Sequence, residues 1–75
     1  MIIKVTNEQP FQVIDGTVAI TLPAGTFQLY ISADGINYTK KGEDITGDDT
    51  LILTNAPKGL FCYISGLSDE VTVLL

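Results

Sequence analysis

The stretch that decides the fold is TVAITLPAGTFQLYIS, residues 17–32. Its first half, Thr17–Leu22, puts Val18, Ile20 and Leu22 on one face with Thr17 and Thr21 on the other. Its second half, Thr26–Ser32, alternates apolar residues with polar ones. A two-residue period is typical of strands that bury one face. Between the two halves lie Pro23 and Gly25, which favour a turn or tight corner. The stretch therefore predicts two strands joined at a corner.

The same alternation continues along the rest of the chain. Further strands are predicted at Ile2–Thr6, Phe11–Ile14, Ile36–Thr39, Thr50–Thr54, Gly59–Ile64 and Glu70–Leu75. Asp-Gly pairs at 15–16 and 34–35 stand between β-forming residues and predict two hairpins. The most polar segment, 40–49, is expected to be a loop, and no window has the apolar spacing of a helix.

These patterns predict an all-β fold in one domain covering residues 1–75. We expect a small antiparallel β-sandwich, Ig-like or jelly-roll-like, of about 7–8 short strands with no substantial helix. Both chain ends are expected to pair into sheets, since strands are predicted at Ile2 and at Leu75.

The size of the chain indicates that its surface is covered by a partner. Domains below roughly 70–80 residues usually need disulfides, a metal or oligomerisation to be stable. This chain has 75 residues, one cysteine and no histidine, which leaves oligomerisation. Only 17% of its residues are charged and 45% are hydrophobic, although a small domain exposes much of its surface. We therefore expect a homo-oligomer, a complex with other proteins, or both.

Charge and hydropathy exclude other partners. The net charge is −5, and the lysines at 4, 40, 41 and 58 form no basic stripe for phosphates, so neither nucleic acid nor an anionic membrane is an expected partner. No apolar run approaches the roughly 18 residues of a spanning helix. The N-terminus has no secretory pattern. A chain that can form no internal disulfide fits synthesis in a reducing cytosol.

A weak candidate for a metal site is the acidic segment, where four carboxylates could converge on calcium. Its residues are Glu43, Asp44, Asp48 and Asp49. The order of a calcium-binding loop is missing, and acids beside lysines more often form a solvated surface loop. We expect no metal and no other cofactor.

Catalysis is not expected either. Cys62 has no histidine to activate it, and the alternation aligns it with Leu60 and Ile64, which predicts core packing. Acid–base chemistry would rest on carboxylates, lysines and tyrosines alone. We therefore predict that the protein is not an enzyme.

Three tyrosines are the candidate interaction residues. Tyr30 and Tyr38 flank the Asp34-Gly35 turn, and Tyr63 shares a strand face with Phe61. Exposed tyrosines can stack on a sugar or anchor a protein. The alternative is that Tyr30 and Tyr38 contact each other across the hairpin and only stabilise the sheet.

One hairpin carries a resemblance to known families. Residues 27–39, FQLYISADGINYT, resemble the "strand, Ser-x-Asp-Gly-x-x-aromatic, strand" hairpin of two groups of proteins. One group is the small β-sandwich auxiliary proteins on tailed-phage virions, such as capsid decoration and head-fibre components, of which those of crAss-like gut phages are an example. The other is discoidin-type and carbohydrate-binding sandwich domains, which are about twice as long and carry tryptophan where this chain has Tyr38.

The resemblance to the phage proteins implies a structural virion component. Such a protein would be made in the host cytoplasm and located in the virion. It would bind the capsid surface, or itself, through exposed sheet edges and apolar surface. The alternative is a glycan- or host-surface-binding module, and the third is a bacterial protein-interaction domain.

Overall fold

The computed structural model describes all residues, 1–75, and contains nine strands and no helix. The strands are β1 (Ile2–Val5), β2 (Phe11–Gln12), β3 (Thr17–Thr21), β4 (Gly25–Ser32), β5 (Thr39–Lys40), β6 (Ile45–Gly47), β7 (Leu51–Asn55), β8 (Phe61–Ser65) and β9 (Val71–Leu74). None of the chain forms a helix with the length and apolar character needed to cross a membrane. The expected all-β class is confirmed.

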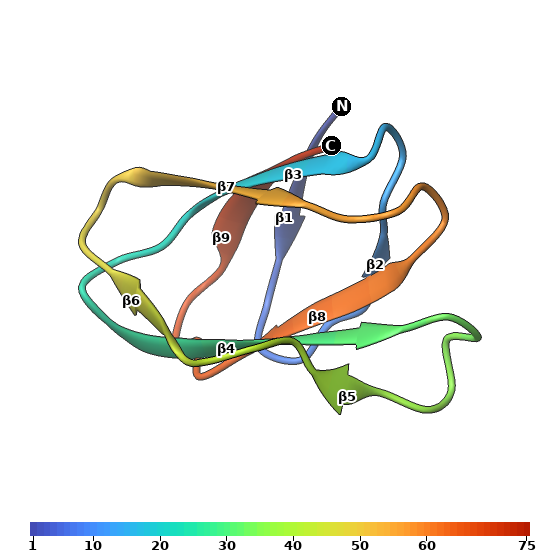
Figure 1. Ribbon diagram of the computed structural model, residues 1–75. Helices are drawn as coiled ribbons and strands as arrows, with labels where there is room; N and C mark the ends of the chain where they lie inside the picture. Colours follow the sequence, from blue (N-terminus) through green and yellow to red (C-terminus); the bar gives the residue numbers. More distant parts are fainter.

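The pairing pattern is that of a single long hairpin rolled up on itself. Antiparallel pairs join β1 to β9, β2 to β8, β3 to β7 and β4 to β6. Rolling brings β9 beside β3 and β8 beside β4, which closes two sheets with the orders β1-β9-β3-β7 and β2-β8-β4-β5. Figure 1 shows the two sheets as facing layers. Of the two expected architectures, the topology is therefore the jelly roll.

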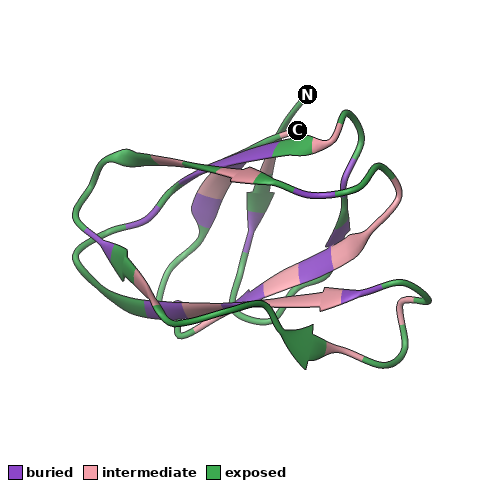
Figure 2. Ribbon diagram, viewed as in Figure 1, coloured by how far each residue is buried: buried purple, intermediate pink, exposed green.

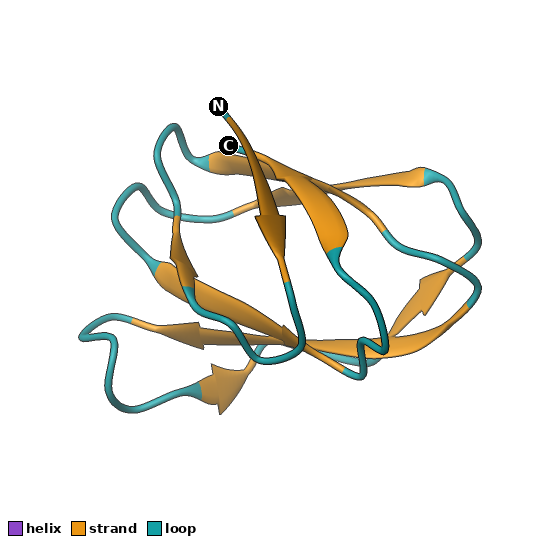
Figure 3. Cartoon of the chain, turned by 180° about the vertical axis from the view of Figure 1, so that it is seen from behind, coloured by secondary structure: helices purple, strands orange, loops and turns teal.

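The two chain ends lie side by side on neighbouring strands (Figure 3). The Met1 ammonium donates a hydrogen bond to the Leu75 carbonyl oxygen at 2.8 Å, and the Leu75 N–H donates to the Met1 carbonyl oxygen at 2.8 Å. Both ends are therefore paired, as the sequence predicted. The β1–β9 ladder joins the first strand of the chain to the last.

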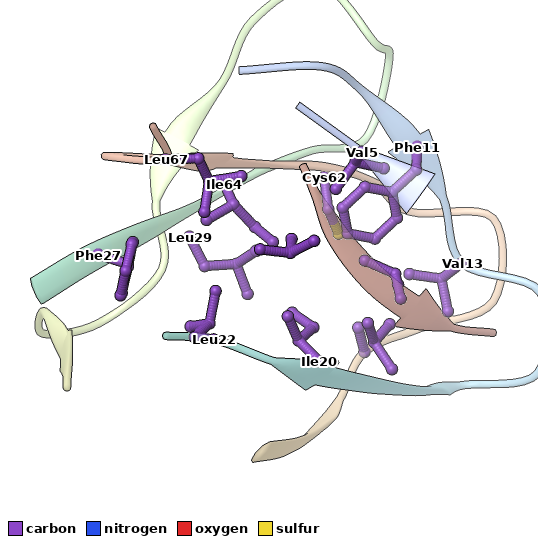
Figure 4. Close-up of a cluster of buried hydrophobic side chains, with 14 residues drawn as sticks. Val5, Phe11, Val13, Ile20, Leu22, Phe27, Leu29, Cys62, Ile64 and Leu67 are labelled. Atoms are coloured by element: carbon purple, nitrogen blue, oxygen red, sulfur yellow. The ribbon is translucent and has the colours of Figure 1, made fainter. Parts of the chain in front are cut away.

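The core lies between the sheets and follows the predicted alternation. Ile20 and Leu22 from the β3 segment meet Leu29 of β4 and Ile64 of β8 in one cluster of buried side chains (Figure 4). Cys62 belongs to the same cluster, as predicted, and is 1% exposed. Exposed residues gather in the loops and along the outer strands, as Figure 2 shows. Burial of these alternate positions is the main stabilising term of a fold this small.

The hairpin predicted at Asp15-Gly16 is wrong. β2 belongs to the five-stranded sheet and β3 to the four-stranded sheet, so the chain crosses between layers there. The Val13 N–H still donates to Leu60 beside β8, whereas the Gly16 carbonyl oxygen already accepts from Ala56 beside β7. Pairing with strands from the far end of the chain therefore replaces the local turn.

Two other expectations are corrected. The predicted strand Ile36–Thr39 is mostly loop, and only Thr39–Lys40 pairs with β4. The predicted loop 40–49 contains β6, whose Gly47 is opposite Gly25. A side chain at Gly47 has no room, since its Cβ would lie 2.1 Å from the Pro23 carbonyl oxygen. The glycine thus lets β6 pack against the corner between β3 and β4.

Candidate functional site: two exposed faces of the sandwich

Three tyrosines gather on the outer face of the five-stranded sheet. Tyr30 of β4 and Tyr63 of β8 are directly opposite each other, and their rings stack with centroids 4.9 Å apart at 14°. The Tyr38 ring packs on Tyr63 at 4.8 Å and 53°. We call Tyr30, Tyr38 and Tyr63 the tyrosine cluster. All three predicted interaction residues therefore belong to one group.

The expected contact between Tyr30 and Tyr38 is not what forms the cluster. Lys40, not Tyr38, is opposite Tyr30 in the β4–β5 hairpin. Tyr63 instead contacts both other rings. The residues between β4 and β5 are too many for a tight hairpin turn, and the loop folds over β8.

Asp34 fixes the shape of this loop. Its Oδ1 accepts hydrogen bonds from the Ile36 and Asn37 N–H groups, both at 2.9 Å, and from the Ser32 hydroxyl at 2.7 Å. Its Oδ2 accepts from the Asn37 side-chain amide at 3.0 Å. These bonds favour the charged form, so the pKa of Asp34 lies well below its ordinary value of 3.8, with the Asn37 N–H as the largest cause. Tyr38 therefore lies in a loop whose preceding residues are held by hydrogen bonds to Asp34.

The turn itself rests on the sheet. Gly35 has φ of 75°, and its N–H donates to the Ser32 hydroxyl oxygen at 2.9 Å. A side chain there would be strained and would come 3.4 Å from the Phe61 ring of β8. The Ser-x-Asp-Gly residues thus form a tight, hydrogen-bonded turn shortly before Tyr38.

Charged groups surround the tyrosine cluster. Burial, with a smaller contribution from Glu8, raises the pKa of Tyr63, and Glu8 accepts a hydrogen bond from Ser65 at 3.2 Å. Lys40 forms an ion pair with Asp44, which raises the pKa of the lysine and lowers that of the aspartate. The half-buried tyrosine rings can stack on an apolar face of a ligand. Their hydroxyl groups and the neighbouring ion pair can form hydrogen bonds with the same ligand.

The acidic residues do not converge. Asp44 pairs with Lys40, and Asp48 accepts hydrogen bonds from the Thr50 N–H and hydroxyl. Nowhere do three or more acidic or thiol side chains lie close enough to hold a metal ion. The carboxylates of Glu43, Asp44, Asp48 and Asp49 therefore act separately.

Cys62 is part of the core rather than of a site. It is opposite Phe11 in the β2–β8 ladder, and burial raises the pKa of its thiol to about 11. A thiol in this setting is a poor nucleophile at neutral pH.

An apolar row on the outer face of the four-stranded sheet was not expected from the sequence. Ile2 of β1 is opposite Leu74 of β9, Leu74 is opposite Ala19 of β3, and Ala19 is opposite Leu53 of β7. Ile2 and Leu53 are 69% and 68% exposed, and Leu74 is 39% exposed. We call Ile2, Leu74, Ala19 and Leu53 the apolar row. The run Leu51-Ile52-Leu53 could have indicated this row, because it is apolar on both faces of its predicted strand.

The comparisons with known proteins find no relative: no family model, curated protein or solved structure matches the chain. No pocket is formed on its surface. Its candidate sites are thus two open faces, the tyrosine cluster on one sheet and the apolar row on the other.

Proposed function

We propose that the protein is a structural component of a bacteriophage virion, a small capsid decoration or head-fibre protein. It binds the capsid surface, a second copy of itself, or both, through exposed apolar surface and sheet edges. Its location is the virion, after synthesis in the host cytoplasm. The virion setting is supported by the likeness of residues 27–39 to hairpins of phage auxiliary proteins, and the jelly roll is also a fold of viral capsid domains. That fold likeness is an analogy.

The apolar row carries the proposal. It crosses all four strands of a sheet whose outer face otherwise carries threonines, Lys4, Asn55 and the exposed Leu51. Ile2, Leu74 and Leu53 are exposed, whereas Ala19 between Leu74 and Leu53 is 8% exposed. Exposed apolar patches are typical of protein-binding surfaces. No acidic side chain lies within these four strands, and Glu70, which directly precedes β9, forms an ion pair with Lys4. Copies that bind the shell and also bind each other are held by linked contacts, which attach them more firmly than one contact would.

Binding to phage heads tests the proposal. The labelled protein is mixed with heads of the phage that encodes it, and bound protein is measured after sedimentation. Leu74→Lys, in the middle of the apolar row, is expected to weaken binding at least about tenfold, since a buried unpaired charge costs more than 1.4 kcal/mol. Gln12→Lys adds the same charge to an exposed position on the other sheet and should leave binding unchanged. Wild-type protein that does not sediment with heads would refute the proposal.

The tyrosine cluster favours a second candidate, a glycan- or host-surface-binding module. Its rings, with Lys40 and Asp44 beside Tyr30, offer both stacking surface and hydrogen-bonding groups. Binding on a glycan array that is lost in Tyr38→Ala would support this candidate. Because Tyr38 lies on the loop rather than in a ladder, the variant keeps the sheet intact.

A further inference from the structure

One sheet edge lacks the features that keep natural edges unpaired. Such features include short length, lysine and proline. β2 has two residues and follows Pro10, β5 has two residues and contains Lys40, β6 has three residues, and β1 contains Lys4. β7 has five residues, Leu51–Asn55, and contains no charge, glycine or proline. β7 is therefore the edge best suited to pair with another strand.

The backbone groups of β7 that face away from β3 can be identified. The Ala56 N–H donates to the Gly16 carbonyl oxygen at 2.9 Å, and this pair continues the β3–β7 register. Hydrogen-bonded residues alternate along an antiparallel ladder, so Thr54 and Ile52 also direct their backbone groups toward β3. The groups that point outward belong to Leu51, Leu53 and Asn55.

We propose that β7 pairs with β7 of a second copy of this chain, antiparallel, about a two-fold axis at Leu53. In this register Leu53 is opposite Leu53 of the second copy, and Leu51 is opposite Asn55 of the second copy. Each of these residues has outward-facing backbone groups, so every such pair can exchange both N–H···O bonds. The contact is isologous and closes at the dimer.

The same register joins the two apolar rows. Leu53 is the last residue of the row at the β7 edge and is largely exposed in the single chain, as Figure 2 shows for most of β7. Pairing at Leu53 places the two leucines side by side on one face of an eight-stranded sheet. The apolar row then runs without a break across both copies.

Charges at the ends of β7 are complementary in this register. Counting five residues outward from Leu53 in each direction reaches Asp48 and Lys58. Asp48 lies before the bend at Asp49, and Lys58 lies in the turn after Pro57, so the two charges flank β7 just outside the paired residues. In an antiparallel pairing the Asp48 end of one copy lies near the Lys58 end of the other. Lys58 has no ion-pair partner within its own chain. Opposite charges near each end of the contact favour antiparallel over parallel pairing, which would bring like charges together.

The inference deepens the proposed function and rests on its claim of self-association, since it names the strand and the partner. The pairing of one short strand buries less than the roughly 800 Å² per partner of a standard stable interface. The dimer should therefore dissociate on dilution, and would be strengthened where copies are arrayed together.

Cross-linking tests the register. The Cα atoms of a hydrogen-bonded antiparallel pair are about 5.5 Å apart, which a disulfide can span. Leu53→Cys should form a disulfide-linked dimer under mild oxidation at least about tenfold faster than Ile2→Cys. Ile2 is the matched control because it lies on the other edge strand of the same sheet with 69% exposure against 68%. Cys62 is buried in both variants. Equal rates would overturn the proposed pairing.

Light scattering across a dilution series up to about 1 mM tests the pairing without a new cysteine. We expect the mass to rise to twice 8.1 kDa. Leu53→Lys should raise the dissociation constant at least about tenfold, whereas Ile2→Lys should not. Asp48→Lys should weaken the dimer, and Asp48→Lys combined with Lys58→Asp should restore it. A monomer throughout that still binds phage heads would overturn the β7 pairing alone. A β7-paired dimer that binds no heads would support the pairing and overturn the virion role alone.

Discussion

The substitution Gly47→Ala should destabilise the protein strongly, because β6 packs directly on the corner between β3 and β4. An added Cβ would lie 2.1 Å from the Pro23 carbonyl oxygen and 2.9 Å from Leu22 Cβ. Relief of the first contact requires a backbone movement of about 1 Å, and overpacking of this kind costs about 1–3 kcal/mol or more. The lower entropy of the unfolded alanine chain offsets about 0.4–1 kcal/mol. Because an approach of 2.1 Å to a backbone atom lies at or above the upper end of the first range, we expect a net loss of about 2–3 kcal/mol.

That loss is a large part of the stability of so small a domain, which for 75 residues is about 4–11 kcal/mol. The melting temperature should fall by about 10–20 °C, measured by circular dichroism. Thr46→Ala, at an exposed neighbouring position of β6, should change stability by less than about 1 kcal/mol. If Gly47→Ala melted with the wild-type protein, the close approach of β6 to Pro23 would be wrong, and β6 would not anchor the turn that leads into β7.

Other perturbations address the core and the loop. Ile20→Ala, at a fully buried position, should lose about 2–5 kcal/mol in urea unfolding, and a loss below 1 kcal/mol would contradict the packing described. Cys62 should resist thiol reagents at neutral pH, because burial raises its pKa to about 11, and labelling should follow unfolding; fast labelling of the native protein would show that the core is open. Asp34 has a lowered pKa in the folded state, so its contribution to stability is complete above the unfolded value of 3.8 and is lost as the pH falls through the folded pKa. Asp34→Asn should therefore lose less stability than the wild-type protein on acidification to about pH 2.5, and equal losses would contradict this role.

The strands of the fold could be predicted because burial follows the two-residue period. Val18, Ile20 and Leu22 all lie in the core, and Thr17 and Thr21 lie outside. The topology could not be predicted, because it depends on which distant strands pair. The Asp15-Gly16 dipeptide has the composition of a hairpin turn, but its flanking strands pair with β8 and β7 instead of with each other.

Local polar contacts explain the other differences. The Ser32 hydroxyl and the Asp34 carboxylate bind the backbone of the following residues, which keeps Ile36–Tyr38 out of the sheet despite its β-forming composition. In segment 40–49 a single apolar residue, Ile45, packs against the core. One apolar residue cannot show a two-residue alternation, so strand β6 could not be predicted.

The candidate sites were predicted in part. Tyr30 and Tyr38 flank a predicted turn, Tyr63 shares a strand face with Phe61, and the three tyrosines form one cluster. That Tyr63 lies at its centre depends on the β4–β8 register, which no local pattern contains. The apolar row also depends on register, since its four residues come from four strands that are distant in sequence.

The most direct test of the proposed function is quantitative mass spectrometry of purified virions of the phage that encodes the chain. We expect peptides of this protein in every preparation, at many copies per virion. When the heads are removed from the sample, these peptides should be lost with them. Their absence from virions, with the protein found only in the infected-cell lysate, would contradict it.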